Sequence, residues 1–257
     1  MPSKNSEDIR KSMLPLALVT GSAHRLGKTF AICLARQGFG IILHYNNSKE
    51  KVSSVSDEIQ SFGVPVFPIQ ADLRDEAQIQ SLFTYIDALL EKPDSRNLEL
   101  RILVNSAAIM TRIDAKNISV KEFNKTIDLN LRAPFFCAQN AYKRMTPGGL
   151  IVNISDIAAQ KAWSGYPIYT ISKAGMDSMT KVLARSFAPK VRVNSITLGL
   201  ALASDNISPE EWSKLIGRLP IQREASSVDL CITLEFLLKN EYITGQTIVL
   251  DGGYSLL

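Results

Sequence analysis

Short apolar runs alternate with longer amphipathic runs along most of this chain. The apolar runs are Leu16–Thr20, Ile41–Tyr45, Pro65–Gln70, Ile102–Val104, Leu150–Ile154, Val191–Ile196 and Thr247–Leu250. The amphipathic runs are Lys28–Gln37, Lys51–Phe62, Glu76–Leu90, Val120–Met145, Ala174–Phe187 and Val228–Leu238. Strands of a parallel sheet are almost continuously apolar because helices cover both of its faces. The alternation therefore predicts an α/β fold with a doubly wound parallel sheet.

No linker rich in Pro, Gly or Ser divides the chain, so we expect a single domain over residues 14–257. Residues 1–13 are polar and charged, and we interpret them as a flexible N-terminal extension. The segment at about 199–220 interrupts the alternation after the sixth apolar run. Long loops at the carboxyl ends of strands often cover a ligand, so we interpret this segment as a substrate loop, with a structural insertion as the alternative.

The composition argues against several kinds of partner. The chain is 46% hydrophobic and 21% charged, which is typical of a globular protein. Its net charge is only +4, and its basic residues are interleaved with acids, so we expect no nucleic-acid partner. The apolar stretch Leu14–Val19 is too short for a signal or a membrane span, so we expect no membrane partner and a cytoplasmic location.

The three cysteines, Cys33, Cys137 and Cys231, lie far apart and form no CxxC or Cys/His cluster. We therefore expect neither a metal site nor a disulfide, and we interpret each cysteine as a small buried apolar residue. This usage is typical of a reducing compartment.

A turn suited to phosphate binding follows the first apolar run. In Thr20–Gly27, Gly21 permits a tight turn and Gly27 permits close packing of helix and strand. Backbone amides at the start of the next helix can hold a pyrophosphate, and we expect contacts there from Gly21, His24, Arg25 and Leu26. Arg25 stands where the middle Gly of a G-x-x-x-G-x-G motif is expected. Its guanidinium could bridge the pyrophosphate and a substrate, or it could be an ordinary surface arginine.

The end of the second apolar run indicates which cofactor is bound. An NAD site usually has an Asp or Glu there for the ribose hydroxyls. No acid appears before Glu50, whereas His44, Tyr45, Asn46, Ser48 and Lys49 would tolerate a 2′-phosphate, so NADP(H) is favoured. After the third run, we expect Asp72 and Leu73 beside the adenine, although Asp72 could equally be a helix N-cap.

Tyr169 and Lys173 are four residues apart and project from one face of a helix. A phenol has a pKa of about 10, and a nearby ammonium lowers it. The pair can therefore relay a proton, while Lys173 also holds the nicotinamide ribose.

Together these features resemble the short-chain dehydrogenase/reductase family over nearly the whole chain, including Asp251-Gly252-Gly253 near its end. The resemblance implies a Rossmann-type sheet and a homotetramer. It places the cofactor beside Asn105, Ser106, Ala107 and Gly199. It also implies that Asn130 holds a water molecule in the proton relay. The family usually has Asn at the position of Ser106.

Asp156 stands thirteen residues before Tyr169, where this family normally has its catalytic Ser. A carboxylate there would repel a developing alkoxide, but it can accept from a ring N–H or pass a proton to a ring nitrogen. The pteridine reductases resemble this arrangement closely. They share Arg25 in the turn, Asp156, His44-Tyr45, and the tail Tyr242-Ile243-Thr244-Gly245 with Asp251 to Leu256. They typically have an aromatic residue near the position of Met110.

We therefore expect an NADPH-dependent reductase of a pterin-like substrate, of the dihydropterin or dihydrofolate type. The expected catalytic residues are Asp156, Tyr169, Lys173 and Asn130. The expected substrate contacts are Arg25, Met110, Asp156, Tyr169 and Trp212. One alternative is a carbonyl reductase acting on a substrate such as a 3-oxoacyl thioester. Another is a non-catalytic dinucleotide-binding regulatory protein on the same fold.

Overall fold

A computed structural model describes residues 13–91, 98–203 and 207–257. Most of the expected N-terminal extension and part of the expected substrate loop lie outside these ranges. In the described residues, a sheet of seven parallel strands has the order β3-β2-β1-β4-β5-β6-β7, which confirms the doubly wound Rossmann-type fold. The strands are β1 Leu14–Val19, β2 Gly40–Tyr45, β3 Val66–Gln70, β4 Leu98–Asn105, β5 Gly149–Asp156, β6 Val191–Leu198 and β7 Thr247–Leu250.

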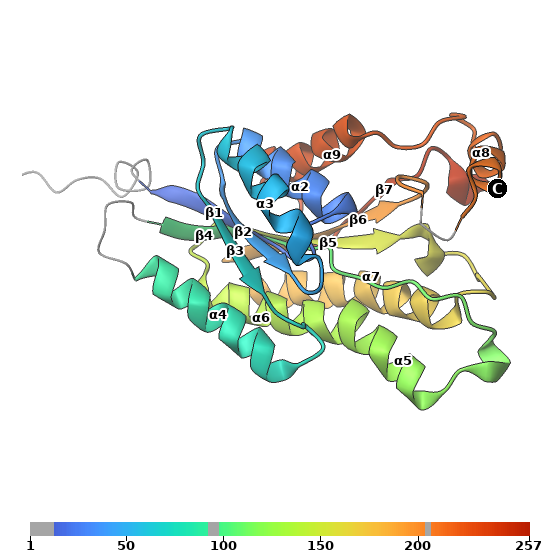
Figure 1. Ribbon diagram of the computed structural model, residues 1–257, viewed down its shortest axis with the longest axis horizontal. Coiled ribbons are helices and arrows are strands. Elements are labelled where there is room, and N and C mark those ends of the chain that lie inside the picture. The colour runs from blue at the N-terminus through green and yellow to red at the C-terminus, as the bar shows by residue number, and fades with distance from the viewer. Residues whose placement is uncertain (1–12, 92–97, 204–206) are drawn as a thin grey trace, which may run out of the picture.

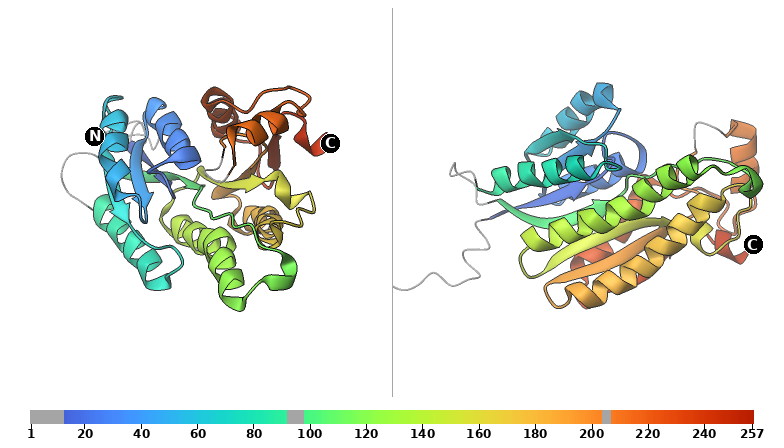
Figure 2. Two further views of the ribbon diagram at one scale, coloured as in Figure 1. Left: turned by 45° about the vertical axis from the view of Figure 1, so that its right-hand side comes forward. Right: turned by 90° about the horizontal axis from the view of Figure 1, so that it is seen from below.

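Helices cover both faces of the sheet (Figures 1 and 2). They are α2 Arg25–Arg36, α3 Lys49–Gln60, α4 Glu76–Leu90, α5 Val120–Ile127, α6 Ala133–Arg144, α7 Pro167–Phe187, α8 Pro209–Ile216 and α9 Ser227–Lys239. Alternate side chains of β1 pack on opposite faces of the sheet. Leu16 and Leu18 pack with α4, α6 and α7, whereas Ala17 and Val19 pack with α2, α3 and α9. Burial on both faces explains the unbroken apolar character of the central strands.

The helix predicted over Val120–Met145 is divided in the structure. Between α5 and α6, residues Asp128–Arg132 form a π-helical turn. Pro134 in the first turn of α6 explains the break, because it has no N–H to donate to the preceding turn. Single π turns inside helices often occur at functional sites, and this one carries Asn130. Helix α7 begins at Pro167, earlier than the amphipathic run that starts at Ala174, and it carries Tyr169 and Lys173 as the spacing predicts.

The structure corrects the expectation for the cysteines. Cys33 on α2 and Cys231 on α9 form a disulfide, with Cα atoms 5.5 Å apart. The two helices pack side by side on one face of the sheet, which brings together residues 198 positions apart. Cys137 is free and buried, and burial raises the pKa of its thiol to about 12. The cysteines therefore give no support for a reducing compartment.

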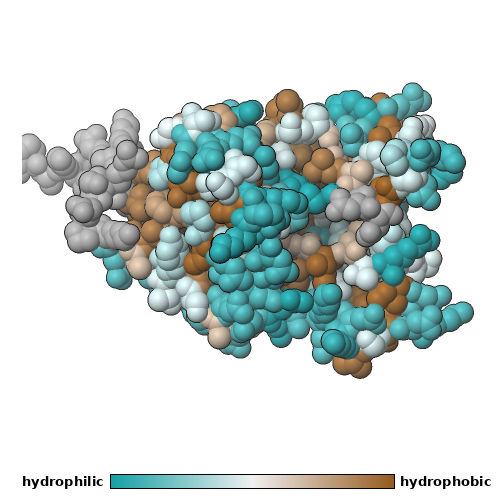
Figure 3. All heavy atoms as spheres, viewed as in Figure 1, coloured by the Kyte–Doolittle hydropathy of each residue, from teal (hydrophilic) through white to brown (hydrophobic). Residues whose placement is uncertain are grey.

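On the face seen in Figure 3, hydrophilic residues dominate and apolar residues form small separate patches. Across the described ranges, no helix combines the length and apolar character needed to cross a membrane. Those ranges also hold no group of three or more His, Cys, Asp or Glu residues placed to bind a metal ion. The described part of the expected substrate loop includes helix α8. A capping box formed by Ser208 and Glu211 marks the start of this helix.

Candidate active site

The candidate site lies at the carboxyl ends of the strands, on the side that carries α8 and the C-terminus (Figure 1). Strands β1 and β4 are neighbours, but the chain continues from β1 to β2 on one side and from β4 to β5 on the other. The segments that follow these two strands therefore diverge, and parallel sheets bind ligands in the crevice that such a divergence opens.

The turn after β1 is tightly constrained. Gly21 has φ +68°, and a Cβ there would lie 3.0 Å from Ala107 Cα. A Cβ on Gly27 would lie only 2.2 Å from the carbonyl oxygen of Gly21. The turn and the start of α2 therefore need glycine at both positions. His24 is the extended residue before α2, and Leu26 packs against the core from the first turn.

His44 lies beneath this turn rather than at the surface. Its Nδ1 accepts a hydrogen bond from Gly21 N at 3.0 Å, and its Nε2 lies 2.9 Å from Ala71 O. Because Nδ1 accepts, Nε2 carries the hydrogen and donates it. Burial lowers the pKa of His44 to about 4, so the ring is neutral at pH 7. The expected contact with a 2′-phosphate is therefore corrected: both ring nitrogens are already engaged, and His44 supports the turn.

Arg25 joins the turn to the segment that follows β6. Its Nη1 donates to Ala203 O at 2.7 Å, and its Nη2 donates to Leu202 O at 3.2 Å. Its φ is +52°, in the region that favours glycine, which explains why the related motif has Gly at this position. Arg25 thus contacts the expected substrate loop and is exposed near the crevice.

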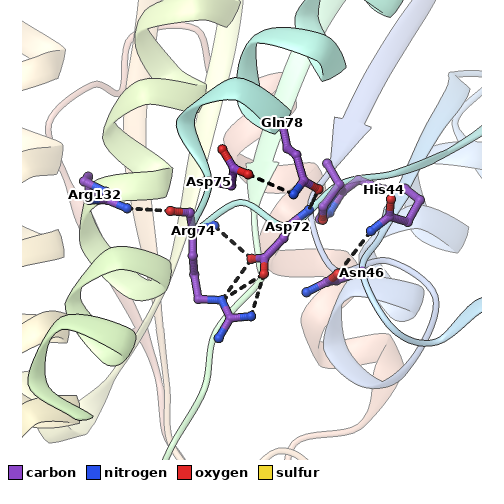
Figure 4. A network of polar contacts seen from close by, with 9 residues as sticks. His44, Asn46, Asp72, Arg74, Asp75, Gln78 and Arg132 are labelled. Atoms are coloured by element: carbon purple, nitrogen blue, oxygen red, sulfur yellow. Dashed lines mark hydrogen bonds and ion pairs between the residues drawn. The ribbon is translucent and has the colours of Figure 1, made fainter. Parts of the chain in front are cut away.

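Asp72 is not the N-cap of α4. That cap is Asp75, whose carboxylate accepts from Ala77 N at 2.9 Å. Asp72 instead pairs with Arg74, whose Nε lies 2.9 Å from Asp72 Oδ1 and whose Nη2 lies 2.5 Å from Oδ2 (Figure 4). The N-cap alternative is thereby excluded for α4, and sequence reasoning missed Arg74.

The other residues expected around the adenosine lie at the ends of β2 and β3. Tyr45, Asn46 and Ser48 are partly exposed there, and Asn46 Oδ1 accepts from Gln70 Nε2 at 3.2 Å. Leu73 is buried in the core against α4, so only its backbone can face a ligand.

Polar atoms gather where β1 and β4 end. Thr20 Oγ1 accepts from Ser106 N at 2.9 Å and from Ala107 N at 3.1 Å. Asn105 Nδ2 donates to Asn153 Oδ1 at 2.9 Å. Within the described residues, Asn105 Oδ1 and Ser106 Oγ are buried and have no hydrogen-bond partner. Buried polar atoms normally have partners, so these two fit a polar ligand that crosses the crevice, as a dinucleotide would.

Asn130 is fully buried in the π-helical turn. Its Nδ2 donates to Ile109 O at 2.8 Å and to Ser172 Oγ at 3.1 Å, and its Oδ1 accepts from Ile109 N at 2.9 Å. Both amide hydrogens are thus engaged, and the side chain fixes the segment that leads to Met110. The side chain of Asn130 is therefore not free to bind the water molecule implied by the family resemblance.

Asp156, Tyr169 and Lys173 meet between β5 and α7. Tyr169 Oη donates to Asp156 Oδ2 at 2.9 Å. Asp156 Oδ1 accepts from Ala158 N at 2.8 Å, so the same carboxylate both caps the next turn and faces Tyr169. Lys173 Nζ donates to Ile154 O at 2.7 Å and lies 5.6 Å from the centre of the Tyr169 ring.

Burial controls the protonation of this cluster. Burial raises the pKa of Asp156, against the opposing contacts of Ala158 N, Lys173 and Tyr169. Burial and the charge of Asp156 raise the pKa of Tyr169 well above its usual value. Burial lowers the pKa of Lys173 to about 8. The expected lowering of the Tyr169 pKa is therefore corrected: desolvation and the neighbouring Asp156 carboxylate raise it.

Two aromatic residues that sequence reasoning did not select lie near Asp156. The rings of Trp163 and Tyr254 are 6.2 Å apart. Burial and the charge of Asp156 raise the pKa of Tyr254, which shows that Tyr254 is close to that carboxylate. By contrast, Met110 is 40% exposed. Trp212, expected at the substrate, lies on α8 and donates from Nε1 to Glu224 Oε2 at 3.0 Å.

The C-terminal turn holds Tyr254 in place. The Asp251 carboxylate accepts from Gly253 N at 2.9 Å and from Ser255 N at 2.7 Å. A Cβ on Gly199 would lie 2.7 Å from Asp251 Cα, so Gly199 lets the end of β6 approach this turn. The Asp-Gly-Gly-Tyr sequence was the signal that could have predicted an aromatic wall here.

Comparisons with known proteins agree with this arrangement. A family model described as "Enoyl-(Acyl carrier protein) reductase" matches residues 21–255. The 3-oxoacyl-(acyl-carrier-protein) reductase of Staphylococcus aureus is 32% identical over 248 residues, covering 94% of this chain and 98% of the relative. The chain therefore belongs to the short-chain dehydrogenase/reductase family and is an oxidoreductase.

Solved structures show the same similarity in three dimensions. The FolM alternative dihydrofolate reductase 1 of Brucella canis, complexed with NADP, is 30% identical with a TM-score of 0.87, and the match covers 96% of this chain and 95% of that one. A blue fluorescent protein from a metagenomic library, in complex with NADPH, is 27% identical with a TM-score of 0.85, covering 94% of this chain and 98% of that one.

Proposed function

We propose that this protein is an NADPH-dependent reductase of a pterin-like heterocycle, of the dihydropterin or dihydrofolate type. The observation that carries the proposal is the 2.9 Å hydrogen bond from Tyr169 to Asp156, a carboxyl group where the family normally has a hydroxyl. The similarity to an alternative dihydrofolate reductase from Brucella canis supports the same substrate class.

NADP(H) is the proposed cofactor. Two structural relatives were solved with NADP or NADPH, and no acid stands at the end of β2 in this chain. The constrained turn at Gly21 and the buried polar atoms of Asn105 and Ser106 would hold the dinucleotide, and Lys173 would hold its nicotinamide ribose. When bound, the cofactor supplies a hydride.

Tyr169 is the proposed proton donor. Its raised pKa keeps the phenol protonated at neutral pH, which a donor requires. Loss of its proton would create a phenolate 2.9 Å from the Asp156 carboxyl group. The buried Lys173 ammonium stabilises any remaining negative charge on the pair.

The walls of the site suit a flat ring. Trp163 and Tyr254 provide aromatic surface near Asp156, in place of the aromatic residue missing at Met110. Asp156 can bind amino and ring N–H groups through its oxygens, whereas the alkoxide of a reduced ketone would be repelled by the ionised form.

Reduction of a 3-oxoacyl thioester is the second candidate, because the Staphylococcus aureus relative carries that activity in its name. An assay of NADPH oxidation with dihydrobiopterin, dihydrofolate and an acetoacetyl thioester separates the candidates. We expect turnover with the two pterins. Turnover confined to the thioester would favour the second candidate. Cofactor binding without turnover of any of the three would support the non-catalytic regulatory alternative.

We also propose a homotetramer. Helix α9 exposes Val228, Ile232 and Phe236 at successive turns, with exposed fractions of 61%, 60% and 44%. On the opposite layer, α7 exposes Ile171 and Val182. Apolar strips of this kind mark subunit contacts in many proteins, and two separate strips allow a tetramer with two kinds of interface. Light scattering coupled to gel filtration would measure the assembly.

A further inference from the structure

A negatively charged side chain lies at the edge formed by β2 and β3, where it would repel a phosphate. If the cofactor is NADP(H), as proposed above, its 2′-phosphate lies at the end of β2 beside Asn46. Hydrogen bonds from Arg74 and also from Asn46 lower the pKa of Asp72. An ionised carboxylate therefore lies next to Asn46. Left uncompensated, it would repel the phosphate dianion.

Arg74 is held on that carboxylate by several contacts. Its Nε lies 2.9 Å from Asp72 Oδ1 and 3.2 Å from Oδ2, its Nη2 lies 2.5 Å from Oδ2, and its backbone N donates to Oδ1 at 3.0 Å. A planar guanidinium in this bidentate geometry matches the carboxylate in both charge and shape. The Arg74 side chain remains 36% exposed, so its charge also acts at the surface.

The turn that carries Arg74 is anchored from both sides (Figure 4). Arg132 Nη2 donates to Arg74 O at 2.6 Å, and Arg132 also pairs with Asp128 at 3.1 Å. On the other side, Asp72 N donates to Gln78 Oε1 at 2.7 Å. The ion pair therefore has a fixed position relative to β3 and to the π-helical turn.

An open groove of about 650 Å³ runs beside the pair. Asp72, Arg74, Asp75 and Gln78 line one side, and α5 lines the other with residues that include Lys121 and Lys125. The lysines belong to the far wall. The ion pair lies beside the end of β2, because Ala71 N, next to Asp72, donates to Tyr45 O, next to Asn46, at 3.0 Å. Arg74 is thus the groove cation with a direct chain of contacts to that strand end.

We propose that Arg74 is a cofactor-specificity residue, which cancels the charge of Asp72 beside Asn46 and so allows a 2′-phosphate to bind there. It compensates for the basic residue that the end of β2 lacks. The inference rests on the proposed cofactor, and it assigns the preference for that cofactor to a residue after β3 rather than after β2.

The test compares two ligands that differ only in the 2′-phosphate, 2′,5′-ADP and 5′-AMP. Their Kd values are measured by isothermal titration calorimetry on the wild type, Arg74→Gln, the double variant Asp72→Asn with Arg74→Gln, and Lys125→Gln. Effects on the shared adenosine cancel in the ratio of the two Kd values. We expect the wild type to prefer 2′,5′-ADP, and Arg74→Gln to lose about tenfold of that preference, as expected for one uncancelled charge at a partly exposed site.

The double variant separates charge cancellation from other roles of Arg74. Because the double variant also removes the carboxylate charge, it should recover most of the preference for 2′,5′-ADP over 5′-AMP. The control variant Lys125→Gln should keep all of that preference. A preference that survives Arg74→Gln would overturn the inference while leaving the cofactor proposal intact. Failure of the double variant to recover, or an equal loss in Lys125→Gln, would also overturn it. A wild type without any preference would overturn the cofactor proposal and this inference together.

Discussion

Tyr169 donates a hydrogen bond of 2.9 Å from its hydroxyl to the carboxylate of Asp156. Both side chains are buried, and burial raises the pKa of each. The buried phenol of Tyr169 therefore keeps its proton, which suits a site that must donate a proton during a reduction. A Ser at position 156 would leave the phenol beside a neutral hydroxyl, so the carboxyl group is what separates this site from the usual family arrangement.

Replacing Tyr169 by Phe removes the proposed proton donor and keeps the ring. We expect turnover of dihydropterin to fall by roughly 10²-fold or more, the scale of a lost general acid. NADPH binding can be measured by the quenching of protein fluorescence. It should persist because Lys173 keeps its hydrogen bond to Ile154. Near-normal turnover in this variant would remove Tyr169 from the mechanism.

The end of β2 predicts a preference for NADPH over NADH, since no acid is present there to bind free ribose hydroxyls. Steady-state kinetics with each cofactor at a fixed dihydropterin concentration would measure kcat/KM for both. We expect the higher value with NADPH. An equal or higher value with NADH would contradict the cofactor assignment.

Replacing Gly27 by Ala should disrupt the turn that holds the pyrophosphate. The new Cβ would lie 2.2 Å from Gly21 O, a backbone atom that cannot move without shifting the turn. We expect a stability loss of about 1–3 kcal/mol, typical of overpacking, and clearly weaker NADPH binding. Gly217→Ala is the matched control, because its Cβ would lie 3.4 Å from its nearest neighbour. Unchanged binding in Gly27→Ala would show that the turn does not hold the cofactor.

His44 should make stability depend on pH. The folded protein binds a proton on His44 only near pH 4, because burial lowers that pKa from 6.5. The unfolded chain binds more protons between these values, so stability falls as the pH drops from 6.5 through 4, by about 3 kcal/mol from this residue. His44→Gln lacks this contribution. Urea unfolding at pH 7 and pH 4.5 should show a smaller decrease for the variant, and equal decreases would contradict the assignment.

Much of the fold followed from local patterns. The apolar runs predicted the strands, and the spacing of Tyr169 and Lys173 predicted their common helical face. Short-range chemistry also indicated the turn at Gly21, because the conformational demands of a tight turn are visible in sequence.

The errors came from contacts between distant segments. Burial of His44 under Gly21 and the Cys33–Cys231 disulfide depend on how elements pack, which residue spacing does not reveal. The pKa of Tyr169 also cannot be predicted from its spacing to Lys173, since desolvation is set by the whole fold. Pro134, in contrast, was a visible local signal for the break between α5 and α6.

The central claim is that Asp156 makes this a site for a nitrogen heterocycle. Asp156→Ser restores the usual family residue. The Ser side chain can still hydrogen-bond to Tyr169, but it lacks the negative charge with which the Asp156 carboxylate would bind a ring amine. The decisive measurement is kcat/KM of wild type and variant on a dihydropterin and on a ketone. We predict a loss of about 2–4 kcal/mol in transition-state stabilisation for the dihydropterin, with ketone reduction unchanged or improved. Dihydropterin turnover that survives the substitution intact would contradict the account.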